Sequence, residues 1–184
     1  DTAISYGQGH NEALVGRAIA SSGVPRDNLQ IATKFGIVRG EHGVHLDAHP
    51  DRIAGYCDES LRRLGTETID LYYLHRVDPQ VPIEESIGAM SELVSQGKVR
   101  HLGVSEVTAD QLHRAHAIHP IAAVQFEWSL MWREPEVNIV PAARQLGVGL
   151  VPYSPLGRGL LGGSLNTTSV AESPFRANDP RFNG

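Results

Sequence analysis

A set of polar side chains stands where short apolar segments of this 184-residue chain end, or just ahead of its first helical segment. They are Asp1, Tyr6, Lys34, His75, Ser105 and Gln125. Burying a lysine at the end of an apolar strand is costly, because desolvation disfavours its charged form. Lys34 therefore needs a carboxylate partner, and Asp1 is the nearest candidate. A phenol beside that ammonium would have a pKa below its usual value of about 10, which makes Tyr6 a proton donor near neutral pH.

These residue types match the reduction of a carbonyl group. Hydride arriving at the carbonyl carbon leaves negative charge on oxygen, which a tyrosine hydroxyl and an imidazole N–H can bind and then protonate. We assign Tyr6 as the general acid and His75 as the second donor. Taken singly, Tyr6 is more typical of packing and His75 of a buried core histidine. Together with Asp1 and Lys34 at neighbouring strand ends, one shared reaction explains them better.

Buried strands must carry these side chains. Short apolar segments rich in β-branched residues predict strands at 29–35, 69–75, 99–105, 121–128 and 147–154. The intervening segments repeat apolar residues at intervals of three and four, which predicts helices packed on a sheet. Residues 160–184 are rich in Gly, Ser, Asn and Pro without a period, so we expect a long loop there.

Helix boundaries have clear signals. Pro50 suits a first helical turn, and Thr108 with Gln111 forms a capping-box pattern. Pro141 interrupts the last helical pattern, so that helix should be kinked or start late. Glycines suited to helix C-termini follow three segments. They are Gly65, Gly97 and Gly147.

Strict alternation of strands and helices predicts a parallel α/β fold, either doubly wound or a (β/α)8 TIM barrel. No G-x-G-x-x-G follows a strand, so the barrel is favoured as the fold of a single domain over residues 1–184. Such barrels usually need about 250 residues. We therefore expect an incomplete barrel that lacks its first and last strands, and a partial sequence.

Composition excludes several classes of protein. Hydrophobic residues make up 41% and charged residues 20%, which argues against disorder. The net charge of −5 and the scattered arginines argue against nucleic-acid binding, and no segment reaches the roughly 18 apolar residues of a membrane span. Cys57, the only cysteine, shares a helix face with Ile53 and Leu61, so it should be a buried structural thiol. It fits a reducing compartment, and we expect a cytoplasmic protein. The oligomeric state is open.

The motif around the first residues resembles the aldo-keto reductase family. Asp1, Tyr6, Lys34 and His75 match its tetrad, with the D-x-x-x-x-Y-G spacing intact. This resemblance implies a (β/α)8 barrel that binds NADPH at its C-terminal mouth and reduces an aldehyde or ketone, as an NADP-dependent alcohol dehydrogenase does. The stretch GVSEVTADQLHRAHAIHPIAAVQFEWSL is most similar to the microbial and plant branch with pyridoxal reductases and broad-range aldehyde reductases.

The resemblance also implies a cofactor site. Ser105 and Gln125 would bond the nicotinamide amide, Tyr153 would stack on its ring, and SPLGRGLLGG (154–163) would wrap the pyrophosphate. Backbone N–H groups of such a loop can hold a diphosphate together with an arginine. The residues assigned to the cofactor are Ser105, Gln125, Tyr153, Ser154, Leu156, Gly157 and Arg158. Glu106 departs from the asparagine of many members, so it must turn away or take another role.

Two further groups of side chains have competing interpretations. Histidines recur at intervals of three residues at His113, His116 and His119, a spacing that could indicate a metal-binding face of a helix. A solvated helix face is favoured, and we expect no metal. Trp128, Met131 and Trp132 follow a strand end and fit either an aromatic substrate pocket or core packing.

Two alternatives to the NADPH-dependent reductase remain. One is a reductase-like regulatory subunit that binds cofactor and a partner protein with little turnover. The other is a Schiff-base aldolase with Lys34 as nucleophile. The pairing of Lys34 with Asp1 argues against the aldolase, because an ion-paired ammonium is a poor nucleophile.

Overall fold

The computed structural model describes residues 1–40, 43–179 and 182. A sheet of five parallel strands runs in the order β1-β4-β5-β6-β7. The strands are β1 (Ala32–Phe35), β4 (Ile69–Leu74), β5 (Val99–Ser105), β6 (Ile121–Glu127) and β7 (Gly149–Tyr153). These are the five segments predicted as strands, with small shifts at their ends.

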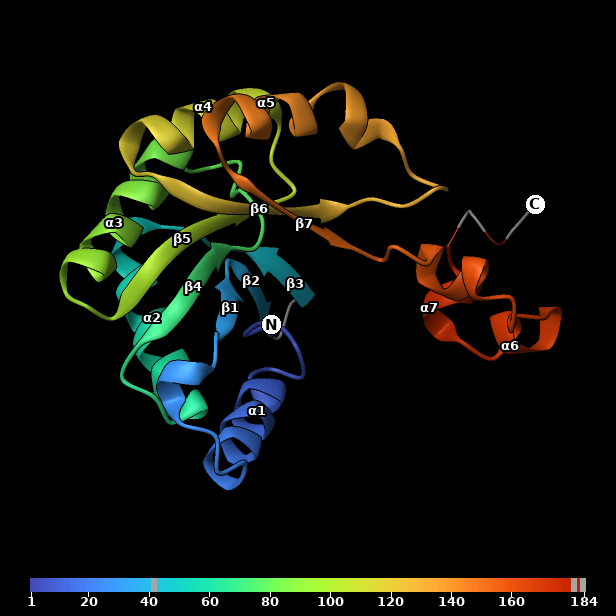
Figure 1. The fold of residues 1–184 in the computed structure, drawn as a ribbon, viewed down its shortest axis with the longest axis horizontal. Helices are drawn as coiled ribbons and strands as arrows, with labels where there is room; N and C mark the ends of the chain where they lie inside the picture. The colour runs from blue at the N-terminus through green and yellow to red at the C-terminus, as the bar shows by residue number, and fades with distance from the viewer. Residues whose placement is uncertain (41–42, 180–181, 183–184) are drawn as a thin grey trace.

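Helices cover one face of this sheet. They are α1 (His10–Ser21), α2 (Pro50–Leu64), α3 (Ile83–Ser95), α4 (Ala109–Ile118) and α5 (Ile139–Leu146). Figure 1 shows the strands fanning into a curved sheet, with these helices along its outer, convex side. Ile53, Cys57 and Leu64 of α2 are buried in the core, as their spacing predicts. Each fully buried apolar side chain stabilises the fold by roughly 1.5–3 kcal/mol before chain entropy is counted.

The predicted helix boundaries are confirmed. Pro50 opens α2, and Gly65 ends it in the left-handed conformation that a Cβ would disfavour. The Thr108 hydroxyl accepts from Gln111 N at 3.1 Å, and Gln111 Oε1 accepts from Thr108 N at 2.9 Å, which completes the capping box. The last helix starts late, at Ile139, after a short 3₁₀ helix, η2 (Glu134–Val137).

Two segments differ from the predictions. An antiparallel hairpin, β2 (Ile37–Gly40) with β3 (Gly43–Leu46), was not predicted, because each strand has only four residues and β3 is exposed throughout, so the alternation of Val44 and Leu46 is too short to indicate a strand. Residues 160–184 were expected to be a long loop, but their described part, 160–179 and 182, contains short helices. These are η3 (Gly157–Gly162), which begins ahead of the segment, α6 (Thr167–Ala171) and α7 (Pro174–Ala177). Local capping explains α7, since the Ser173 hydroxyl accepts from Arg176 N at 3.4 Å. Figure 1 shows α6 and α7 lying away from the sheet.

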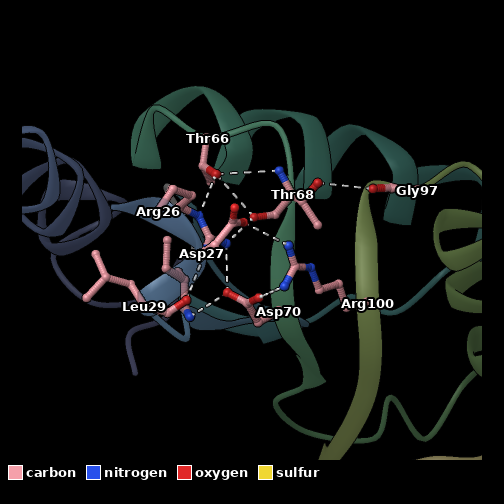
Figure 2. Close-up of polar contacts among 9 residues, drawn as sticks. Arg26, Asp27, Leu29, Thr66, Thr68, Asp70, Gly97 and Arg100 are labelled. Carbon is pink, nitrogen blue, oxygen red and sulfur yellow. Dashed lines mark hydrogen bonds and ion pairs between the residues drawn. The ribbon is translucent and has the colours of Figure 1, made fainter. Parts of the chain in front are cut away.

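The amino ends of the strands are joined by one polar cluster (Figure 2). Arg26, in the 3₁₀ helix η1 (Arg26–Asn28), lies 2.7 Å from Asp70 Oδ2, and Arg100 lies 3.2 Å from Asp70 Oδ1. Ile31 N donates to the same carboxylate at 2.8 Å. Burial alone would raise the pKa of Asp70, but the Ile31 N–H and the two guanidinium groups outweigh it and hold that pKa below its usual value. This cluster therefore ties together the ends of β1, β4 and β5.

The parallel sheet with helical crossovers is an incomplete (β/α)8 barrel. Residues ahead of α1 run along the outer edge of β1, because Thr2 N donates to Ala32 O at 2.9 Å and Ile4 N to Lys34 O at 3.0 Å. This brings the first residues of the chain beside the carboxyl end of β1. Among the described residues, no helix has both the length and the apolar character needed to cross a membrane.

Candidate active site

Lys34 and Asp1 form a close ion pair, as the sequence predicts. Lys34 Nζ lies 2.6 Å from Asp1 Oδ1 and donates to Thr2 O at 2.9 Å. The lysine side chain is only 1% exposed, whereas that of Asp1 is 44% exposed. Burial lowers the pKa of Lys34 to about 8, and repulsion from Arg76 adds to this effect. The ammonium is thus held in a dry setting from which its proton leaves more easily than from an ordinary lysine.

Gln125 contacts the other oxygen of the same carboxylate. Its Nε2 donates to Asp1 Oδ2 at 2.8 Å. Gln125 lies on β6, paired in register with Ser105 on β5, and both side chains are buried. The site therefore spans the sheet from β1 to β6 on its inner side.

Tyr6 and His75 meet beside the lysine. Their ring centroids are 5.9 Å apart with an interplanar angle of 84°, and Lys34 Nζ lies 5.4 Å from the centroid of the Tyr6 ring. His75 immediately follows β4, and its backbone N–H donates to the backbone carbonyl of Phe35 on the neighbouring strand at 2.8 Å. Tyr6 is 45% exposed and His75 only 8%, so the phenol faces solvent over a recessed imidazole. The tetrad predicted from sequence is assembled.

The imidazole of His75 is uncharged. Burial, followed by repulsion from Lys34 and Arg76, lowers its pKa to about 3. Its Nδ1 is buried with no hydrogen-bond partner among the described residues. A neutral imidazole carries one N–H, so His75 can donate one hydrogen bond to a substrate oxygen but cannot serve as an imidazolium acid near pH 7.

Arg76 is a site residue to which the sequence analysis gave no role. It is half-buried, and its Nη1 donates to His75 O at 2.7 Å and to Ser105 Oγ at 3.3 Å. The signal was its position in the sequence, directly after His75 at the end of the apolar strand segment. Its charge acts on both Lys34 and His75.

Glu106 takes a structural role, one of the two roles left open for it. Its Oε1 accepts from Glu127 N at 3.0 Å, and its carboxylate also accepts from the Tyr153 hydroxyl. Burial, followed by this hydrogen bond, raises the pKa of Tyr153. Glu106 adopts a left-handed backbone with φ of 52°, which turns its side chain toward the ends of β6 and β7. It thereby fixes Tyr153 at the carboxyl end of the sheet.

The loop after β7 is arranged differently from an open anion cradle. Arg158 pairs with Asp179 and lies 3.6 Å from Glu127 Oε2. The N–H groups of Gly157 and Gly159 donate to Ser154 O and Leu156 O within tight turns. Leu156 is exposed. Ser154, Leu156, Gly157 and Arg158 thus follow the site in the chain, but among the described residues no hydrogen bond or ion pair joins them to the tetrad.

In the aromatic segment after β6, one tryptophan packs against neighbouring side chains and the other is exposed to solvent. The Trp128 indole N–H donates to Glu136 Oε1 at 3.1 Å, and its ring lies 6.0 Å from that of Phe126. Met131 and Trp132 are exposed, and Trp132 lines a cleft of about 460 Å³ together with Glu106. Trp128 therefore packs, whereas Trp132 borders a cavity.

The remaining titratable candidates take no part in the site. Cys57 is buried, and burial raises the pKa of its thiol to about 12. His116 Nδ1 accepts from Ile121 N at 3.3 Å, which gives that histidine a role at the end of its helix. In the described part of the chain, no group of three His, Cys, Asp or Glu side chains could hold a metal ion.

Known proteins resemble this chain over nearly its whole length. A family model described as "Aldo/keto reductase family" matches residues 1–179. "Probable aldo-keto reductase 1" from Glycine max is 50% identical over 183 residues, which are 99% of this chain and 52% of that protein.

Solved structures match at similar coverage. A glycerol dehydrogenase from Gluconobacter oxydans superposes with a TM-score of 0.87 at 36% identity, over 100% of this chain and 55% of its own. The holo form of an aldo-keto reductase from Bacillus halodurans superposes with a TM-score of 0.79 at 35% identity, over 88% of this chain and 53% of its own. This chain spans about half the length of these relatives.

Proposed function

Because this chain belongs to the aldo/keto reductase family, we propose that the whole protein reduces aldehydes or ketones to alcohols with NADPH as hydride donor. The observation that supports this most is the assembly of Asp1, Tyr6, Lys34 and His75 in one place. The ammonium, the phenol and the neutral imidazole lie together at the carboxyl end of β1 and β4. This is where parallel α/β barrels carry their chemistry.

Each side chain has a defined task in the proposed reaction. Asp1 and Thr2 O hold the Lys34 ammonium, which favours loss of the phenolic proton of Tyr6 to the substrate oxygen. His75 donates its single N–H to the same oxygen and orients the carbonyl. Both donors act on the oxygen where negative charge develops, so they stabilise the transition state more than the bound substrate.

The buried pair Ser105 and Gln125 fits the carboxamide of a nicotinamide. The two residues are register partners on adjacent strands, and their hydroxyl and amide groups can complement a primary carboxamide. When bound, NADPH supplies the hydride. Tyr153 offers an aromatic face, and the segment 154–158 with Arg158 would hold the diphosphate. Arg158 must then exchange or share its contacts with Asp179 and Glu127.

The test is an assay of the whole protein with NADPH and a panel of aromatic aldehydes, with NADH run in parallel. Oxidation of NADPH that depends on the aldehyde, at higher kcat/KM than with NADH, supports the proposal. Tyr56→Phe is a matched control, because it removes a hydroxyl that bonds Asp47 rather than the tetrad. Binding of neither cofactor, with no turnover of any aldehyde, would overturn the proposal.

One observation favours a second candidate, a Schiff-base aldolase. The lowered pKa of Lys34, about 8, is typical of an amine that can act as a nucleophile. Its bonds to Asp1 Oδ1 and Thr2 O oppose this, because both hold the protonated form in place. Borohydride treatment in the presence of a carbonyl substrate distinguishes the two functions. A covalent adduct on Lys34 would establish the aldolase, and its absence with NADPH-dependent turnover would establish the reductase.

The proposal includes a cytoplasmic location. Cys57 is buried with a raised thiol pKa, so it needs no oxidising compartment. The partner expected from the site is a small carbonyl substrate. Fractionation of cells with an antibody against the chain tests the location.

A further inference from the structure

Arg76 is a half-buried cation that joins two strand ends. Its guanidinium donates to the carbonyl of His75 at the end of β4 and to the hydroxyl of Ser105 at the end of β5. In the part of the chain that the structure describes, no carboxylate lies within ion-pair distance of it. A half-buried cation that repels the Lys34 ammonium and has no carboxylate partner of its own costs stability, so a functional reason for it is expected.

The contact with Ser105 determines which way that hydroxyl can act. A guanidinium has donors only, so the Ser105 oxygen accepts from Arg76 and its own proton is directed to a different acceptor. Asp1 imposes the matching constraint on Gln125. A carboxylate only accepts, so Nε2 faces Asp1 and the amide oxygen Oε1 is turned elsewhere.

We propose that Arg76 is a positioning residue that fixes Ser105 as a hydrogen-bond donor to the carbonyl oxygen of the nicotinamide carboxamide, opposite Gln125 Oε1 as acceptor for its amino group. The pair then presents one donor and one acceptor in a defined order on adjacent strands. This inference rests on the proposed function. It adds Arg76 to the cofactor site as a residue that acts through Ser105.

A double-mutant cycle tests the coupling. The dissociation constant of NADPH is measured by fluorescence titration for the wild-type whole protein, Arg76→Met, Ser105→Ala and the double variant. Ser105→Ala should weaken binding about tenfold and Arg76→Met about fivefold, the size of one lost hydrogen bond. In the Ser105→Ala background, Arg76→Met should change affinity less than about twofold, because its effect passes through the hydroxyl.

Simple loss of positive charge gives a different result. If Arg76 acts on the cofactor only through its charge, Arg76→Met weakens binding equally in both backgrounds, and the proposal is overturned. Arg62→Met is the matched control, since Arg62 is exposed on α2. The affinity of this variant for NADPH should stay within about twofold of wild type. If Arg76→Met fails to fold, Arg76→Lys replaces it. Arg76 makes both contacts through Nη1, and the shorter lysine side chain cannot bring its ammonium to that position, so a loss confined to the Ser105-containing background is expected.

An analogue tests the polarity. The 3-acetylpyridine form of the cofactor keeps the carbonyl oxygen and lacks the amino group. The losses caused by Ser105→Ala and Arg76→Met should persist with this analogue, whereas the loss caused by Gln125→Met should disappear. The reverse pattern would overturn the assigned polarity. If the wild type binds neither NADPH nor NADH, the proposed function fails with it; if it binds and the cycle is additive, only the role of Arg76 fails.

Discussion

Asp1 and Gln125, 124 positions apart in the chain, are joined by a 2.8 Å hydrogen bond between the glutamine amide and the carboxylate that pairs with Lys34. In the sheet, β4 and β5 separate β1 from β6, so this carboxylate reaches across the inner side of the curved sheet. The position of the Lys34 ammonium therefore depends on a residue far from it in the sheet.

Tyr6→Phe should lower kcat for aldehyde reduction by about 10²- to 10⁴-fold, because the proposed proton donor is removed. NADPH affinity should stay within about twofold of wild type. Steady-state kinetics and fluorescence titration measure the two quantities separately. Tyr56→Phe controls for loss of a phenolic hydroxyl elsewhere. Turnover near the wild-type level in Tyr6→Phe would remove Tyr6 as the acid.

The pH dependence of reduction should reflect Lys34. Burial and Arg76 lower its pKa to about 8, so the ammonium that assists Tyr6 is present below that pH and lost above it. We expect kcat/KM to fall about tenfold per pH unit above pH 8. Lys34→Arg stays protonated, so its profile should remain flat to higher pH even if the rate is lower. An unchanged falling limb in Lys34→Arg would assign the titration to another group.

His75 should contribute no titration step near neutral pH. Its pKa, lowered to about 3 by burial and two nearby cations, leaves the imidazole neutral from pH 5 to 7. Wild-type kcat/KM should be flat over that range. His75→Ala should raise KM for the aldehyde about tenfold or more while NADPH affinity stays within about twofold. A step near pH 6.5 that disappears in His75→Ala would contradict the neutral assignment.

Asp70→Asn should destabilise the fold. The carboxylate joins Arg26, Arg100 and Ile31 N at the amino ends of the strands (Figure 2), and its charge is lost in the variant. We expect the free energy of unfolding to fall by about 2–3 kcal/mol, measured by urea denaturation at pH 7. Asp27→Asn is the control, since its exposed side chain lies 3.6 Å from Arg100 and should change stability by less than about 0.5 kcal/mol.

The difference between wild type and Asp70→Asn should also depend on pH. The folded-state pKa of Asp70 is held below its unfolded value of about 3.9. The stabilisation is therefore complete above that value and is lost as the pH falls through the folded-state pKa. A difference that stays constant from pH 6 to pH 2.5 would show that the charge of Asp70 does not stabilise the cluster.

Much of this protein could be predicted from local sequence. Apolar segments of strand length, helical periodicity and capping residues such as Thr108 act within a few positions of each other, so they indicate each element without knowledge of the rest. Because parallel strands place their carboxyl ends on one side, the same pattern predicts that Lys34 and His75 meet. The hairpin of β2 and β3 was missed because its strands of four residues each are too short to show a clear pattern.

Apart from the ion pair of Lys34 with Asp1, which the sequence predicts, the tertiary structure alone decided how the side chains at these strand ends are paired. Arg76 reaches Ser105 across 29 positions, Glu106 bonds the backbone of Glu127 across 21, and Gln125 bonds Asp1 across 124. Arg158 contacts Asp179, which lies in the segment 160–184 that was expected to be a loop. Each pairing depends on strand register and on where the turns after the strands direct the chain. A sequence pattern of period two or 3.6 determines which face a side chain occupies, but not which distant group it meets on that face.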